Sequence, residues 1–128
     1  MNIPFETYRV PEKTRELLIQ IKRKTQIEHW NVLCRWCFCL SIAQSTNIPS
    51  QSYDLSEDST TEINWRTLFG EEDSVYAALI HYISRKEGIK TESKILPFCK
   101  LHIHRGAMIM NRYEQLSVVT RILEGKSS

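Results

Sequence analysis

The amino-acid sequence predicts a mainly α fold: a compact helical domain preceded by a short N-terminal strand. Apolar residues recur at helical spacing in several stretches, and residues 3–10 alternate weakly with β-branched and aromatic side chains. A length of 128 residues and 41% hydrophobic residues suit one globular domain. We therefore expect a single domain over residues 1–128. It would comprise a strand-helix-helix opening at 1–43, a polar loop at 44–61 and a helical remainder at 62–126.

The opening of the chain has clear boundaries for its strand and first helix. The strand at 3–10 ends at Pro11, whose missing N–H is tolerated in the first turn of a helix. The first helix is predicted over Pro11–Lys24. Its last turn contains three consecutive cations, which suit the negative end of the helix dipole. These are Lys22, Arg23 and Lys24.

The second helix, predicted over Glu28–Ala43, is apolar on nearly all sides. Arg35 is the one charged residue between Trp30 and Ala43. A helix of this kind must be buried on most of its surface, so it is either the central core helix or part of a subunit interface.

The lengths of these three elements are similar to those of a ribbon-helix-helix unit. In that unit the strands of two chains pair, and the resulting ribbon enters the major groove of DNA. We therefore predict a ribbon-helix-helix-like opening, with Arg9 on the outward side of the strand beside Glu6 or Thr7.

The second half of the chain is predicted to be largely helical. Ile63, Trp65 and Phe69 recur near period two and indicate a short strand or an anchored loop. A third helix is expected over Ser74–Lys86, and a fourth begins near Pro97. Gly106 either interrupts the fourth helix or permits close helix contact. The tail continues at helical spacing through Leu116, Val119 and Leu123.

Charge is distributed unevenly, although the net charge is only +2. Residues 1–36 contain seven basic and four acidic residues, and residues 81–128 contain nine basic and four acidic residues. Residues 54–73 contain one basic and seven acidic residues. Two basic ends therefore flank an acidic middle, a pattern that allows an anionic partner at the ends.

The N-terminus and the cysteines indicate a cytoplasmic protein. No basic region followed by an apolar one opens the chain, and no apolar run reaches the ~18–20 residues that span a bilayer. In a reducing compartment, Cys34, Cys37, Cys39 and Cys99 are expected to remain thiols.

Metal binding and catalysis are weaker interpretations. Cys34, Cys37, Cys99 and His102 have side chains that zinc prefers, but the first two lie on a strongly apolar helix, where cysteine acts as a small hydrophobe. His102 and His104 are either surface or hydrogen-bonded residues. The acidic run between Asp54 and Asp73 could in principle hold Mg²⁺, yet such a run is more often a solvated face. No nucleophile motif or phosphate-binding loop is present. We therefore expect neither a cofactor nor an enzyme.

Three stretches resemble a known family when they are taken in order. They are NVLCRWCFCLS at 31–41, LFGE at 68–71 and LHIHRG at 101–106. This order and spacing resemble the DndE family, small proteins of the DNA phosphorothioation machinery, over roughly Phe5 to Met110. The first stretch is fairly specific, and the other two strengthen it. The chain departs from the family at Gln26, which follows Thr25 where glycine is usual.

The resemblance implies a role in replacing oxygen by sulfur in the DNA backbone, beside a separate cysteine desulfurase and ATP-using components. It also implies binding to duplex DNA with a preference for nicks, and a homotetramer with a ribbon-helix-helix-like fold. Surface cations would contact phosphate. The expected DNA-binding residues are Lys22, Arg23 and Lys24, then Lys13, Arg15 and Arg35, with Arg9 and Arg105 completing the set.

Other functional classes remain open from the sequence. A ribbon-helix-helix regulator would prefer one palindromic site by a large ratio. A metal-dependent nicking enzyme would use the acidic run or the Cys/His set. An adaptor would dock other proteins on the apolar second helix and would have no role at DNA.

Overall fold

The computed structural model of the chain describes residues 3–44, 46–48 and 53–127, with side chains described up to Arg112. Its elements follow one another as a strand and two helices, a second strand, and then three more helices. They are β1 (Thr7–Pro11), α1 (Glu12–Thr25), α2 (Trp30–Ile42), β2 (Asp58–Asn64), α3 (Trp65–Phe69), α4 (Asp73–Lys86) and α5 (Ile95–Ser127), with short 3₁₀ turns η1 (Gly70–Glu72) and η2 (Glu92–Lys94). The mainly α fold class is confirmed.

The opening strand-helix-helix is present, but β1 has a partner within the same chain. β1 pairs antiparallel with β2, with Tyr8 opposite Ile63 and Arg9 opposite Glu62. The predicted polar loop was therefore wrong at its C-terminal end, because residues 58–61 belong to a strand. Their polar composition hid a period-two pattern in which Ser59 faces inward and its hydroxyl donates to the Val10 carbonyl at 2.7 Å.

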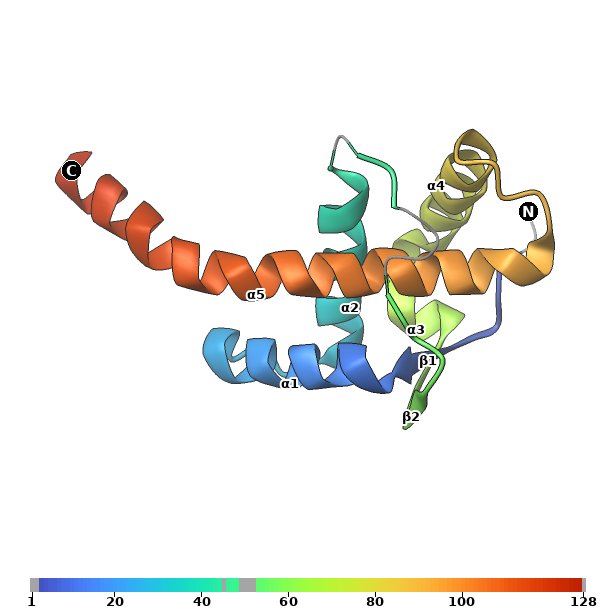
Figure 1. Cartoon of the computed structure of the whole chain (residues 1–128), viewed down its shortest axis with the longest axis horizontal. Coiled ribbons are helices and arrows are strands. Elements are labelled where there is room, and N and C mark those ends of the chain that lie inside the picture. The colour runs from blue at the N-terminus through green and yellow to red at the C-terminus, as the bar shows by residue number, and fades with distance from the viewer. Residues whose placement is uncertain (1–2, 45, 49–52, 128) are drawn as a thin grey trace.

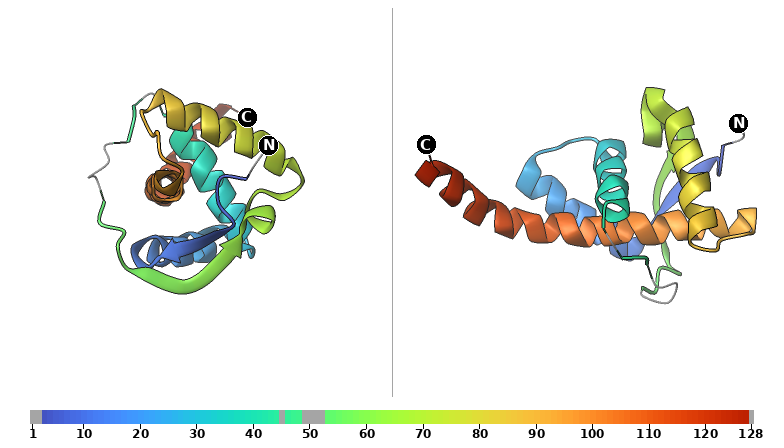
Figure 2. Two further views of the ribbon diagram at one scale, coloured as in Figure 1. Left: turned by 90° about the vertical axis from the view of Figure 1, so that its right-hand side faces the viewer. Right: turned by 90° about the horizontal axis from the view of Figure 1, so that it is seen from above.

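α5 organises the rest of the molecule. Figure 1 shows this single helix running across the whole structure, with α1 alongside it and α2 crossing it. The two further views in Figure 2 show that α4 and the β1–β2 pair lie on different sides of α5. Pro97 lies in the first turn of α5, where its missing N–H does no harm. The tail predicted to be helical is part of α5, although the side chains of Leu116, Val119 and Leu123 lie outside the described residues.

Gly106 does not interrupt α5 and instead allows α2 to approach closely. A Cβ at Gly106 would lie 1.7 Å from the Cys37 carbonyl oxygen and 2.3 Å from the carbonyl carbon. Only a residue without a side chain fits at this crossing. Of the two roles that the sequence left open for Gly106, the structure therefore shows close helix contact.

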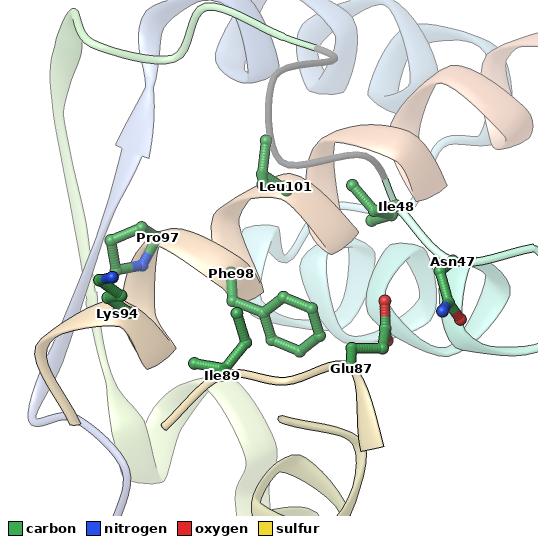
Figure 3. Close-up of a pocket in the computed structure, with 8 residues that line it drawn as sticks. All are labelled: Asn47, Ile48, Glu87, Ile89, Lys94, Pro97, Phe98 and Leu101. Atoms are coloured by element: carbon green, nitrogen blue, oxygen red, sulfur yellow. The ribbon is translucent and has the colours of Figure 1, made fainter. Parts of the chain in front are cut away.

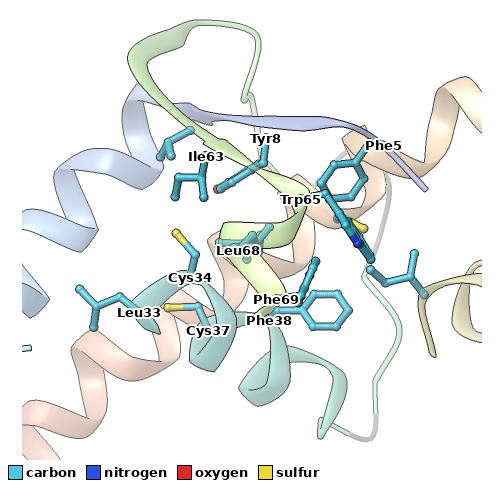
Figure 4. Packing of buried hydrophobic residues seen from close by; sticks show 14 of the residues in the cluster. Phe5, Tyr8, Leu33, Cys34, Cys37, Phe38, Ile63, Trp65, Leu68 and Phe69 are labelled. Carbon is cyan, nitrogen blue, oxygen red and sulfur yellow. The ribbon is translucent and has the colours of Figure 1, made fainter. Parts of the chain in front are cut away.

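The core forms where β1, α2, α3 and α5 meet (Figure 4). Phe38 packs edge-on against Phe69, and Phe69 stacks on Tyr76 with ring centroids 4.5 Å apart. Cys34, Cys37 and Cys99 are buried thiols in this core, as their apolar setting predicted. Burial raises the pKa of Cys37 to about 12, so the group is neutral and unreactive at physiological pH.

The first helix ends in a left-handed residue. Gln26 has φ of 61°, and its N–H donates to the Lys22 carbonyl at 2.9 Å. This is the conformation that glycine most readily supplies at a helix C-terminus. The chain therefore makes this left-handed turn with a residue other than glycine.

Within the described part of the chain, no helix has an apolar stretch long enough to cross a bilayer.

Gly106→Ala should lower the free energy of unfolding by about 3 kcal/mol, because the added methyl group forces the backbones of α2 and α5 apart. Gly88→Ala is the matched control. Unlike the helical Gly106, Gly88 has a positive φ of 82°, and nothing lies within 4 Å of its added Cβ, so its cost comes from backbone strain alone and should be about 1 kcal/mol. Urea denaturation of both variants measures the difference. If both variants lost the same free energy of unfolding, α2 and α5 would have moved apart at no extra cost, and the prediction would be wrong.

Candidate nucleic-acid interface

Three cations gather at the C-terminal end of α1, as the sequence predicted. Arg23 and Lys24 are exposed and Lys22 is half-buried. The Lys22 ammonium lies 5.4 Å from the centre of the Trp30 ring, and Lys24 Nζ donates to Asn111 Oδ1 at 2.9 Å. Among the described residues, none of the three forms an ion pair with a carboxylate. Their charge is therefore directed to solvent.

Arg112 adds a fourth cation that the sequence analysis did not single out. Asn111 bonds both Lys24 and Gln20, so this part of α5 lies against the end of α1. The next residue, Arg112, is exposed. It follows Asn111 directly, but it shares the α5 face of Arg105, seven positions earlier, and is turned about 100° around the helix from the Asn111–Lys24 contact. Predicting α5 as a continuous helix would have located it. We refer to Lys22, Arg23, Lys24 and Arg112 as the basic cluster.

Part of this positive charge also stabilises α1 itself. Cations in the last turn of a helix interact favourably with its carbonyl end, typically by 0.3–1 kcal/mol each. A purely structural role of Lys22, Arg23 and Lys24 is therefore a real alternative to ligand binding. The exposed Arg112 lies on a different helix and has no such role at the end of α1.

The basic side chains near the β1–β2 pair interact with neighbouring carboxylates and hydrogen-bond acceptors. Arg9 pairs with Glu62 at 3.2 Å, and Arg15 donates to Thr61 Oγ1 at 3.3 Å. Lys13 is exposed and faces Asp54. Hydrogen bonds from Ser56, helped by the charge of Lys13, lower the pKa of Asp54. The predicted outward position of Arg9 agrees with its exposure.

Arg35 and Arg105 make their main contacts inside the protein. Arg35 Nε donates to the Leu68 carbonyl at 2.8 Å and ties α2 to α3. Arg105 donates to Ser41 Oγ, to the Ser41 carbonyl and to the Thr46 carbonyl at 2.8, 2.7 and 2.9 Å. The Ser41 carbonyl, in the last turn of α2, also accepts from the Gln44 N–H at 3.1 Å, so Arg105 adds a second donor there and ties Thr46 to the end of the helix.

A buried polar chain connects the same region. His102 Nδ1 lies 2.8 Å from Ser41 Oγ, and its Nε2 lies 3.5 Å from Glu87 Oε2. The order Ser–His–Glu is that of a hydrolase triad. Ser41, however, is completely buried and its hydroxyl already accepts a bond from Arg105. A substrate cannot reach this oxygen, so the arrangement supports helix packing and not acyl transfer.

Both histidines of the third stretch are buried and hydrogen-bonded. His104 Nδ1 lies 2.8 Å from Thr14 Oγ1 and joins α5 to α1. Burial, with a smaller contribution from Arg105, lowers the pKa of His102 to about 4. Burial, and then the charge of Lys13, also lower the pKa of His104. Of the two interpretations that the sequence allowed, the hydrogen-bonded one holds.

The structure does not bring together the side chains that the sequence offered as a weaker, metal-binding alternative. In residues 3–44, 46–48 and 53–127, no three His, Cys, Asp or Glu side chains come together to hold an ion. Cys34, Cys37, Cys99 and His102 therefore do not form the zinc site considered above. The acidic run is dispersed as well: Asp58 pairs with Lys100 at 3.0 Å, and Asp73 accepts from Trp65 Nε1 at 3.1 Å.

These features define a small, mainly helical protein with one two-stranded ribbon and a cationic patch where two helices meet. Residues 8–117 match the family described as DNA sulphur modification protein DndE. The chain belongs to the DndE family. No curated protein matches it.

Two solved structures share the fold. DndE from Escherichia coli B7A, involved in DNA phosphorothioation modification, has a TM-score of 0.66 and 16% identity, over 81% of this chain and 94% of that one. A DndE mutant involved in DNA phosphorothioation also has a TM-score of 0.66, with 14% identity over 84% of this chain and 98% of that one. At such identities the comparison shows the fold alone.

Arg105→Ala should lower the free energy of unfolding by about 2–3 kcal/mol, because the Ser41 hydroxyl and the Thr46 carbonyl lose a charged donor and the Ser41 carbonyl keeps only its bond from Gln44. Arg105→Lys should recover only part of this loss, since an ammonium cannot match the guanidinium fork. Chemical denaturation followed by circular dichroism measures both. A stability equal to that of the wild type would show that these bonds are exchanged for water at no cost.

The depressed pKa of His102 predicts loss of stability in acid. His102 binds a proton near pH 6.5 in the unfolded chain and only near pH 4 in the folded chain. The stability that neutral His102 gives the folded state is therefore complete above pH 6.5 and is lost as the pH falls toward 4. Between pH 7 and pH 5, wild-type protein should lose about 2 kcal/mol more unfolding free energy than His102→Gln. Urea titrations at the two pH values test this, and parallel losses would contradict it.

Proposed function

We propose that this protein is a DNA-binding accessory subunit of DNA backbone phosphorothioation, and that it holds duplex DNA, including nicked DNA, through the basic cluster. The observation that supports this most directly is the grouping of Lys22, Arg23 and Lys24 at the end of α1 without paired carboxylates among the described residues, with the exposed Arg112 next to the Asn111 that Lys24 contacts. The family membership supplies the system in which such a subunit would act.

The chemistry of the basic cluster suits the backbone of DNA and not its base sequence. Lysine and arginine neutralise phosphate and release counterions, which produces salt-dependent binding without sequence information. Lys13, Arg15 and Arg9 would extend the contact along the β1 side of the molecule. Arg35 and Arg105 would contribute mainly by holding α2 in place.

We also propose that the protein acts as a homo-oligomer, a tetramer by family likeness, beside the other phosphorothioation components. One apolar surface supports this. Trp36 is half exposed, with 50% of its area accessible, and it borders a hollow of about 320 Å³ on α2 and α5. The other lining residues are Cys39, Leu40, Ala43 and Met110. Exposed apolar patches of this kind commonly mark protein interfaces.

Replacing Lys22, Arg23 and Lys24 together by alanine should leave the fold intact and weaken binding to every DNA sequence. Each lost phosphate contact should lower the slope of log K against log salt concentration by about one unit. Fluorescence anisotropy with intact, nicked and single-stranded DNA at two salt concentrations measures both effects.

A triple change at the C-terminal end of α4 is the matched control. Arg85, Lys86 and Lys90 are exposed, and their replacement by alanine removes the same charge from a different part of the surface. This variant should keep most of the wild-type affinity. Unchanged binding of the α1 variant at low salt, or equal loss in both variants, would overturn the assignment to the basic cluster. A large preference for one palindrome would favour a regulator instead.

A further inference from the structure

A groove lies where the α4–α5 turn meets the start of α5 and the segment after α2 (Figure 3). Its volume of about 470 Å³ falls in the range of small-molecule sites. Most of its wall is apolar, with three polar side chains. The lining residues are Asn47, Ile48, Glu87, Ile89, Lys94, Pro97, Phe98 and Leu101.

The Glu87 carboxylate forms one end of this groove and is incompletely satisfied. Its side chain is only 12% exposed, and Oε1 is buried without a hydrogen-bond partner among the described protein groups. Oε2 faces His102 Nε2 at 3.5 Å, which is too long for a good hydrogen bond. His102 Nε2 is itself buried and unpartnered. The carboxylate at the end of the groove therefore has one unpartnered oxygen, and it lies beside a second unpartnered polar atom, His102 Nε2, which does not line the groove.

Neither neighbouring base neutralises this carboxylate directly. His102 is neutral near pH 7, because its pKa is lowered to about 4. Arg105 is close enough for Glu87 to raise its pKa, but its N–H groups bond Ser41 and Thr46. A carboxylate that is nearly buried without a paired cation is unfavourable, so a positively charged group in the groove would be strongly complementary.

The apolar wall lies beside this carboxylate. Figure 3 shows the Phe98 ring between Ile89 and Glu87, with Leu101 and Ile48 on the other side of the groove and Lys94 at the end away from Glu87. Phe98 is held edge-on against His102, with ring centroids 4.6 Å apart. An aromatic ring beside a carboxylate suits a cation that has an apolar body.

We propose that this groove binds a small amphiphilic amine, in which a protonated ammonium or guanidinium group pairs with Glu87 and an apolar body lies against Phe98 and Leu101. The site is separate from the basic cluster and does not depend on DNA binding.

The test uses two probes of the same shape, 3-phenylpropylamine and its neutral counterpart 3-phenylpropanol, titrated into the full chain and followed by amide NMR. The amine should shift the signals of Ile89, Phe98 and Leu101 and should bind about tenfold or more tightly than the alcohol, since a charge-assisted bond is lost in the alcohol. Glu87→Gln should abolish this difference. Glu92→Gln, an exposed carboxylate on the same turn outside the groove, should preserve it.

Lys94→Ala keeps the test decisive if Glu87→Gln does not fold. Lys94 is exposed, and its removal takes away a like charge, so the amine should bind this variant at least as tightly as wild type. Equal affinity for amine and alcohol would overturn the proposal. So would shifts confined to other parts of the molecule, an affinity weaker than about 10 mM, or weaker amine binding to Lys94→Ala.

Discussion

The close crossing of α2 and α5 at Gly106 is the contact on which the rest of the structure depends. Because Gly106 has no side chain, the Cys37 backbone can lie where a Cβ would otherwise be. The approach brings Ser41 within hydrogen-bonding distance of His102 and Arg105, so the apolar crossing and the polar chain beside it form together. α1 then packs against the next face of α5 through Thr14 and His104.

The helices could largely be predicted from sequence, whereas the pairing of elements could not. Apolar spacing and end charges located α1, α2 and α4 closely, because these signals are local. β2 was missed in part, since Asp58–Asn64 is polar and its alternation becomes meaningful only opposite β1. The unbroken length of α5 was uncertain because a glycine within a helix has the same local signature whether it breaks the helix or packs against a neighbour.

The cations of the chain divide into two groups that the sequence could not separate. Arg35 and Arg105 resemble surface residues in a linear sequence, yet each donates to backbone carbonyls far along the chain. Lys22, Arg23 and Lys24 could be grouped because they are consecutive, whereas Arg112 joins them only through the packing of α1 on α5. Charge patterning predicted a basic end of the molecule but not which arginines are committed to the interior.

The continuity of α5 also links two distant parts of the surface mechanically. Phe98 lines the groove near the beginning of this helix, and Asn111 contacts Lys24 further along the same helix, about 20 Å away at the rise of an α-helix. The crossing at Gly106 lies between them, where α2 approaches α5 most closely. The groove and the basic cluster are therefore held at a fixed spacing along one continuous helix.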